Sequence, residues 1–145
     1  MLSGAIDIPL GMPAAQRART ITNWGFNCTC DLCSAPPEAR EASDKRRERL
    51  VEVHYAMQDA WTSYEALVEL TREFITLAQV EQLLAKVAEY YHSFMRIYYG
   101  VGDGETARKY GRAALKLAEI FSDPEEGFCI GIKQDLQRLD EELSR

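Results

Sequence analysis

The part of the chain that most strongly specifies the fold is the stretch VEQLLAKVAEYYHSFMRIYYGVGDG, residues 80–104. Its apolar residues recur with a period near 3.6, at Val80, Leu83, Leu84, Val87, Tyr91, Phe94 and Tyr98. This spacing predicts a long amphipathic helix that begins at Val80 and buries one face. Three glycines within Gly100–Gly104 end the pattern and predict a turn before the next element.

The stretch after this turn predicts a second helix that carries small residues on one face. Ala107, Gly111 and Ala114 follow one another at helical spacing, which lets a neighbouring helix approach closely. Two long helices joined by a Gly/Asp turn, with such small residues on the second, resemble the tetratricopeptide helix pair. Because a single unit is recognisable, the sequence predicts a tetratricopeptide-like region and not a repeat array.

The rest of the sequence after Glu38 also follows a helical pattern. One further helix carries the apolar positions Leu50, Val53, His54, Met57 and Trp61. Another should begin at a capping box formed by Thr62 and Glu65. The last should begin with Asp123 as its cap and Pro124 in its first turn, followed by an apolar stripe over Phe128, Cys129, Ile132, Leu136, Leu139 and Leu143. Residues 37–145 are therefore predicted to form about five antiparallel helices, and the fold class is all-α.

The first 36 residues are predicted to form a separate segment. A short strand is expected over Ile6–Leu10, followed by a short helix over Ala14–Trp24 that Gly25 ends. Pro36 and Pro37 interrupt the chain and predict a boundary between residues 1–36 and residues 37–145.

Charge and composition argue against two classes of partner. The chain of 145 residues has a formal net charge of -6, and its single basic run, over residues 45–49, is diluted by nearby acidic residues. This balance predicts neither direct nucleic-acid binding nor binding to an anionic membrane. No signal peptide and no apolar run of about 20 residues is recognisable, so no membrane span is expected. Four cysteines, three of them within six positions, do not suit a disulfide framework, so we expect a reducing compartment, the nucleus or the cytoplasm.

Three of the four cysteines form the motif Cys28-x-Cys30-x2-Cys33, which predicts a zinc site. Thiolates bind zinc tetrahedrally, and short spacings let one segment supply several ligands. The alternatives are buried small side chains, a redox pair or a chance cluster. A closed structural site needs a fourth ligand. Cys129 is expected in a helical core, and His54 and His92 are expected as packed or surface residues. The fourth ligand is therefore expected outside this chain, or as water or a partner's group.

These residues together resemble a known family. A short arginine-bearing helix, then Trp24-Gly25-Phe26-x-Cys28-x-Cys30-x2-Cys33, then a helical region, is similar to the post-SET segment of SET-domain protein lysine methyltransferases. The nearest subgroup is the SET-and-MYND type with its fungal relatives, which carry a tetratricopeptide-like domain after these cysteines. The specific part of the resemblance covers about residues 8–36.

The resemblance implies roles for individual residues. Cys28, Cys30 and Cys33 would be three post-SET zinc ligands, with the fourth from a cysteine of the SET core. Phe26 would pack near the adenine of S-adenosylmethionine and help to wall the lysine channel. The implied substrate is a lysine of a protein, often a histone, which accepts a methyl group by direct displacement.

The sequence also departs from the family. Ahead of the cysteines it has neither the Gly-x-Gly cofactor loop nor the Asn-His motif of a SET core, and Asp7 stands where the channel tyrosine is expected. We therefore expect the C-terminal portion of such an enzyme, as a fragment, a truncated gene product or a decayed copy, that does not transfer methyl groups alone. No catalytic residue is assigned. The alternative is a non-enzymatic helical interaction module with a zinc knuckle, and a third reading is a metallothiol or redox protein.

Overall fold

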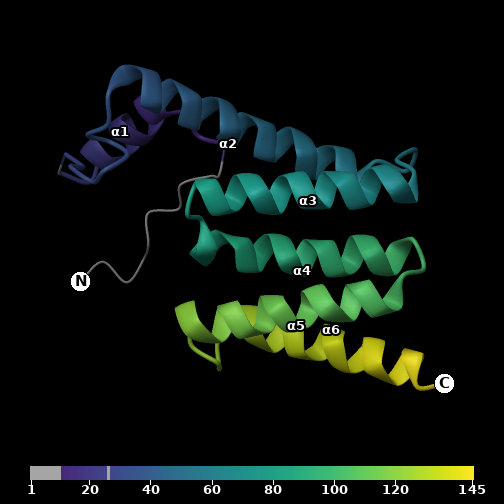
Figure 1. Cartoon of the computed structure of the whole chain (residues 1–145). Coiled ribbons are helices and arrows are strands. Elements are labelled where there is room, and N and C mark those ends of the chain that lie inside the picture. Colours follow the sequence, from purple (N-terminus) through teal and green to yellow (C-terminus); the bar gives the residue numbers. More distant parts are fainter. Residues whose placement is uncertain (1–10, 26) are drawn as a thin grey trace. The chain divides into compact units, whose positions relative to one another are not determined.

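The computed structural model describes residues 11–25 and 27–145, which form helices joined by short loops (Figure 1). The helices are α1 (Ala14–Thr22), α2 (Pro37–Gln58), α3 (Tyr64–Val80), α4 (Leu84–Gly100), α5 (Gly104–Phe121) and α6 (Gly127–Leu143). These described residues contain no strand, so the all-α prediction is confirmed. The strand expected over Ile6–Leu10 lies outside the described residues.

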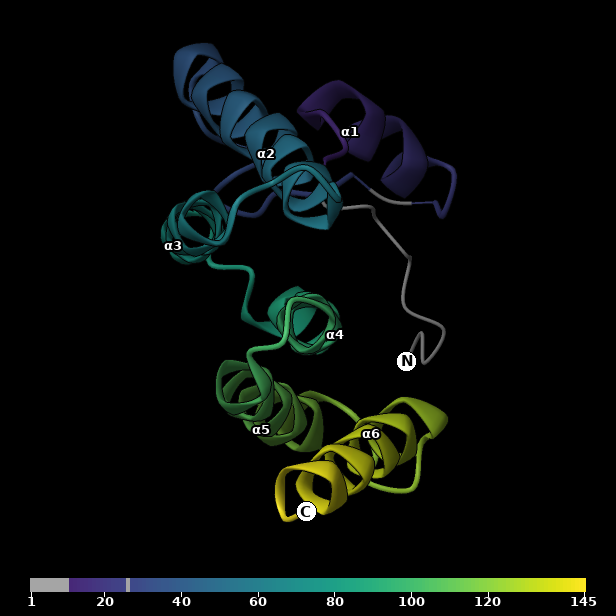
Figure 2. The same cartoon turned by 90° about the vertical axis from the view of Figure 1, so that its right-hand side faces the viewer.

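The chain divides after Glu81 into two compact units, here called the N-terminal unit (residues 1–81) and the C-terminal unit (residues 82–145). In the N-terminal unit, α2 and α3 form an antiparallel pair, and α1 lies against α2 (Figure 1). In the C-terminal unit, α5 packs on both α4 and α6, as the end-on view in Figure 2 shows. The boundary expected between residues 36 and 37 stays a prediction.

A buried carboxylate ties α2 to the end of α3 in the N-terminal unit. The side chain of Glu81 is 3% exposed and receives hydrogen bonds from Ser43 Oγ at 2.7 Å, Arg46 Nε at 2.6 Å and Arg47 Nε at 3.1 Å. Burying a carboxylate is unfavourable unless it is paired and hydrogen-bonded, and this one is both. The pKa of Glu81 reflects the balance, because burial acts to raise it while Ser43, Arg46 and Arg47 lower it below its ordinary value.

Close packing of small residues joins the helices of the C-terminal unit. Ala107, Gly111 and Ala114 are buried on α5, as the sequence predicts. A methyl group built on Gly111 would lie 2.4 Å from Met95 Sδ of α4 and 2.6 Å from Leu136 Cδ2 of α6. Only glycine therefore fits at this contact without a shift of its neighbours. The predicted stripe of α6 is also confirmed at its centre, where Cys129, Ile132, Leu136 and Leu139 are buried.

Several helix boundaries differ from the predictions. Val80 ends α3 and does not begin α4; Glu81 turns toward α2, and Gln82 adopts a positive φ of 55°. At the start of α3 the cap is Ser63, which accepts the Ala66 N–H, because Thr62 donates its hydroxyl to the Ala56 carbonyl instead. Asp123 does not cap α6: its side chain accepts the Glu125 N–H within a turn, and α6 begins at Gly127.

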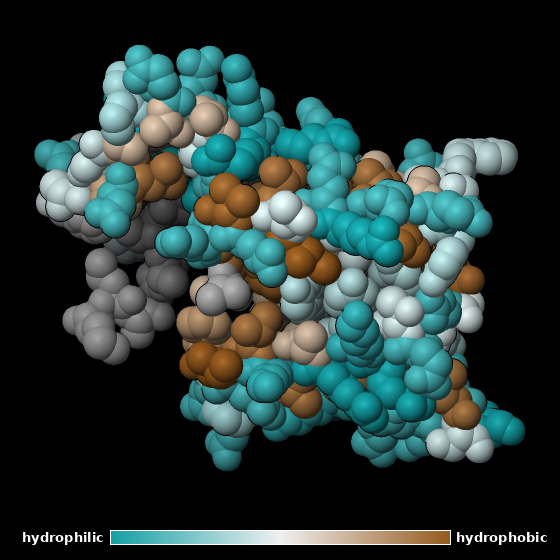
Figure 3. All heavy atoms as spheres, viewed as in Figure 1, coloured by the Kyte–Doolittle hydropathy of each residue, from teal (hydrophilic) through white to brown (hydrophobic). Residues whose placement is uncertain are grey.

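Several large apolar side chains lie on the surface. Trp61, which was predicted on the apolar face of a helix, is 95% exposed, because α2 ends at Gln58 and Trp61 belongs to the following turn. On the face drawn in Figure 3, hydrophilic residues predominate and hydrophobic residues form small separate groups. Among the described helices, none is long and apolar enough to cross a membrane.

Candidate metal centre

The cysteine loop is held between two helices that are fixed to each other. Asp44 of α2 accepts the N–H of Ala14 at 2.8 Å and pairs with Arg17 of α1 at 3.6 Å. Helix α1 ends at Thr22, and the next turn closes when the Gly25 N–H donates to the Thr22 carbonyl. Gly25 has a φ of +89°, a conformation that favours glycine, which agrees with its predicted place after the helix.

Backbone hydrogen bonds fold the cysteine segment into a compact turn. The Ser34 N–H donates to the Cys30 carbonyl at 2.9 Å, and the Ser34 hydroxyl donates to the Thr29 carbonyl at 3.0 Å. The Cys33 N–H points at Cys30 Sγ at 3.5 Å. This turn reverses the chain, so that thiols three residues apart face the same space.

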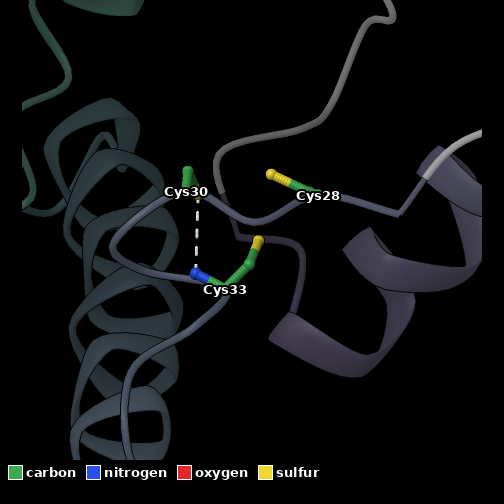
Figure 4. Close-up of side chains that lie close together, drawn as sticks. All are labelled: Cys28, Cys30 and Cys33. Atoms are coloured by element: carbon green, nitrogen blue, oxygen red, sulfur yellow. Dashed lines mark hydrogen bonds between the residues drawn. The ribbon is translucent and has the colours of Figure 1, made fainter.

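The side chains of the three cysteines of this turn lie close together (Figure 4). The Sγ atoms of Cys28, Cys30 and Cys33 all lie within 4.8 Å of one another, and none of the four cysteines of the chain forms a disulfide. Thiolates about 2.3 Å from a tetrahedral zinc ion lie about 3.8 Å apart. The donor set and its spacing therefore fit a thiophilic metal ion with small adjustments of the side chains, and the three cysteines can hold a metal.

The thiols influence one another's ionisation. The Cys33 N–H lowers the pKa of Cys30 because it donates to the sulfur. Burial and the other two thiols raise the pKa of Cys33 to about 12. Three thiols this close do not all ionise at neutral pH unless a cation offsets their mutual repulsion. A divalent ion supplies that charge, so metal binding and deprotonation of the cluster are coupled.

A buried cation lies near this site. Arg17 donates to the Met12 carbonyl at 2.8 Å, while its Nη2 atom is buried without a hydrogen-bond partner. Burial and the charge of Arg47 lower the pKa of Arg17, whereas Asp44 and, more weakly, Cys33 raise it. The positive charge of this guanidinium favours negative charge on the cysteine cluster.

No fourth His, Cys, Asp or Glu side chain joins the three thiols within residues 11–25 and 27–145. Cys129 is buried on α6, as predicted. His54 contacts Gln58 and Phe74 in the N-terminal unit, and His92 bonds to Asp135 in the C-terminal unit. The structure thus brings together the three predicted ligands. Phe26, the predicted cofactor-contacting residue, lies outside the described residues.

Sequence reasoning missed the pair formed by His92 and Asp135, whose side chains lie 2.8 Å apart. The two residues are 43 positions apart in the sequence, and only the packing of α4 and α6 on a common helix brings them together. The helical register of each residue is the one signal in the sequence that bears on this contact.

Comparison of the chain with protein-family models, curated proteins and solved structures finds no match.

Proposed function

We propose that this chain is the C-terminal portion of a SET-domain protein lysine methyltransferase, in which Cys28, Cys30 and Cys33 supply three of four zinc ligands. The observation that carries the proposal is the gathering of three Sγ atoms within 4.8 Å on a loop between a short helix and a helical region. When bound, zinc would cross-link this loop and fix its conformation. The fourth ligand would come from a SET core, whose Asn-His motif the sequence ahead of the cysteines lacks.

In this proposal the helical region is tetratricopeptide-like and serves as a docking domain. Its support is the α4–α5 pair, joined by the glycine turn and packed closely at Gly111. The partner would be a protein, such as a histone substrate, and the setting would be the nucleus or the cytoplasm. S-adenosylmethionine would bind only with the SET core, where Phe26 would lie beside its adenine.

The metal part of the proposal is tested by the zinc content of the purified chain. We expect about one zinc ion per chain, and loss of this zinc when Cys28, Cys30 and Cys33 are all replaced by serine. Cys129→Ala is the matched control, because Cys129 is a buried cysteine on α6 outside the cluster, and it should leave the zinc content unchanged. A metal-free wild-type chain, or equal zinc in the triple variant, would contradict the site.

The enzyme part is tested separately. We expect the coding sequence in frame before residue 1 to encode a SET core with an Asn-His motif. A chain extended through that core should bind S-adenosylmethionine in calorimetry, whereas residues 1–145 alone should not. If zinc binds but no SET core precedes the chain, the non-enzymatic interaction module with a zinc knuckle is the better description.

A further inference from the structure

The four thiols of the chain differ in how well a reagent in solution can reach them. Cys30 is exposed, whereas Cys28 and Cys33 are partly buried. Cys129 is 0% exposed on α6. Because reactive cysteines must be accessible, Cys30 is the thiol of this chain that a dissolved oxidant meets first.

The cysteine turn holds a second thiol beside Cys30. The Cys33 N–H donates to Cys30 Sγ at 3.5 Å (Figure 4), and the Ser34 N–H donates to the Cys30 carbonyl at 2.9 Å. Residues three apart in a turn have Cα atoms within about 7 Å, and a disulfide joins Cα atoms about 4.4–6.8 Å apart. Since the Sγ atoms lie within 4.8 Å of one another, rotation of the two side chains brings the sulfur atoms of Cys30 and Cys33 to bonding distance.

Cys28 is the rival partner for Cys33. Its sulfur belongs to the same cluster, but Cys28 precedes the turn and lies five residues from Cys33. It is also less exposed than Cys30. Both accessibility and the turn hydrogen bonds therefore favour the pair of Cys30 and Cys33.

We propose that the cysteine turn is a redox-sensitive site, in which a peroxide converts Cys30 and Cys33 into a reversible disulfide. Cys30 sulfur attacks one oxygen of hydrogen peroxide, the O–O bond breaks, and a sulfenic acid and one water form. Cys33 sulfur then attacks Cys30 sulfur, the S–O bond breaks, and the oxygen leaves as a second water. Two thiols are thus oxidised to one disulfide, the peroxide is reduced, and the two thiol protons end in the two waters.

This disulfide and a metal ion compete for the same sulfur atoms. Metal ligation requires thiolates, and the disulfide leaves Cys28 as the one thiol of the cluster. The oxidised turn therefore releases zinc, and reduction restores the ligands. Disulfide formation needs only the thiols, whereas the release of zinc rests on the proposed zinc site. In a reducing compartment such a disulfide is transient, as in redox sensors.

The test is treatment of the purified chain with hydrogen peroxide, followed by mass spectrometry before and after reduction with dithiothreitol. We expect the chain to lose the mass of two hydrogen atoms and to regain it on reduction. A protease that cleaves before Asp31 separates Cys30 from Cys33, so the two fragments should stay joined until dithiothreitol is added. Cys129 should remain a thiol, because it is buried.

Single serine variants identify the pair. Cys30→Ser and Cys33→Ser should each lose the peroxide-induced disulfide. Cys28→Ser is the matched control, because it removes a thiol of the same cluster and should keep the disulfide. The proposal is overturned if peroxide only adds oxygen to the chain, if Cys30→Ser forms a disulfide as fast as the wild type, or if Cys129 is oxidised as readily as the cluster.

Zinc is followed in the same samples with a chromogenic chelator. We expect zinc to appear in solution as the disulfide forms. If the purified chain holds no zinc but still forms the disulfide, the proposed zinc site fails and the redox-sensitive site stands. If zinc is bound and peroxide yields no disulfide, with or without prior removal of the metal, the redox-sensitive site fails and the zinc site stands.

Discussion

The two units of this chain use charged side chains in opposite ways. In the N-terminal unit, Glu81 is buried and its oxygens are taken up by Ser43, Arg46 and Arg47. In the C-terminal unit, the central carboxylate is Asp135, which is partly exposed and pairs with two exposed arginines. Helix contacts in that unit depend instead on small and aromatic residues, such as Gly111 and the stacked rings of Tyr98 and Tyr110.

This difference indicates which charges serve the fold and which remain available for binding. Removal of a buried, fully bonded carboxylate is strongly destabilising, because its former partners remain buried as uncompensated charges. An exposed pair contributes little to stability, and its groups can exchange one partner for another. We therefore expect replacement of a buried charged residue to destabilise the N-terminal unit, and replacement of a closely packed small residue to destabilise the C-terminal unit.

The largest effect is expected from Glu81→Ala. It removes the carboxylate but leaves Arg47, which is buried, without this counter-ion. We expect the N-terminal unit to lose about 3–5 kcal/mol of its free energy of unfolding. Amide hydrogen exchange, followed by mass spectrometry, should show lost protection in α2 and α3.

Glu69→Ala is the control for this substitution. Glu69 lies within α3 and is also paired with an arginine, but both partners are exposed, so its loss should change stability by less than about 0.5 kcal/mol. Equal effects of the two substitutions would show that burial of Glu81 does not matter, and the contrast between the units would be lost.

A smaller effect is expected from Gly111→Ala in the C-terminal unit. The new methyl group would overlap Met95 Sδ and Leu136 Cδ2, and both are ends of flexible side chains that can shift in part. We expect a net destabilisation of about 1–2 kcal/mol, since overpacking outweighs the better helix propensity of alanine. Lost protection should appear in α4, α5 and α6.

Gly131→Ala is expected to change the stability in the opposite direction. A methyl group at Gly131 of α6 meets nothing within 4 Å, so only the helix propensity changes. We expect a stabilisation of about 0.5–1 kcal/mol. If both alanines stabilise the protein, close packing at Gly111 is not what joins these helices.

Much of this arrangement could be predicted from local sequence patterns. The stripe of α6 and the small residues of α5 repeat at helical spacing, and both are buried as expected. The cysteine spacing likewise indicated that the thiols gather, because the whole cluster lies within six consecutive residues. Features of this kind depend on residues close together in the chain, so a single sequence contains them.

Features that depend on distant residues were not predictable. The break between α3 and α4 follows from Glu81 turning toward Arg46 and Arg47, which precede it by about 35 residues. Val80 continues the apolar stripe of α4 in the sequence, and neither glycine nor proline marks the break. The ion pairs of Asp135 were missed for the same reason, because its partners come from two helices.

The smallest effect on stability is expected when the pH is lowered. The pKa of Glu81 is below its ordinary value of 4.5 because Ser43, Arg46 and Arg47 outweigh the effect of burial. The folded state therefore binds fewer protons than the unfolded state between these two pKa values, and stability falls as the pH decreases. The contribution of Glu81 is complete above about pH 4.5 and is lost as the pH falls through the folded-state pKa.

The same sign holds for Asp135, because burial acts to raise its pKa but His92 and its arginine partners lower it. Its ordinary pKa is 3.8, so the C-terminal unit should respond at lower pH. Hydrogen exchange between pH 5 and pH 3, corrected for the intrinsic rate, should show α2 and α3 losing protection before α4 and α5. Glu81→Gln, which does not titrate at this position, should lower the protection of α2 and α3 at every pH and make that protection less sensitive to acid. Glu73 of α3, whose pKa is also lowered by Arg49, retains the rest of the acid response. If α2 and α3 of this variant remain as acid-sensitive as in the wild type, a group other than Glu81 governs the acid response, and the buried carboxylate is not the source of the difference between the units.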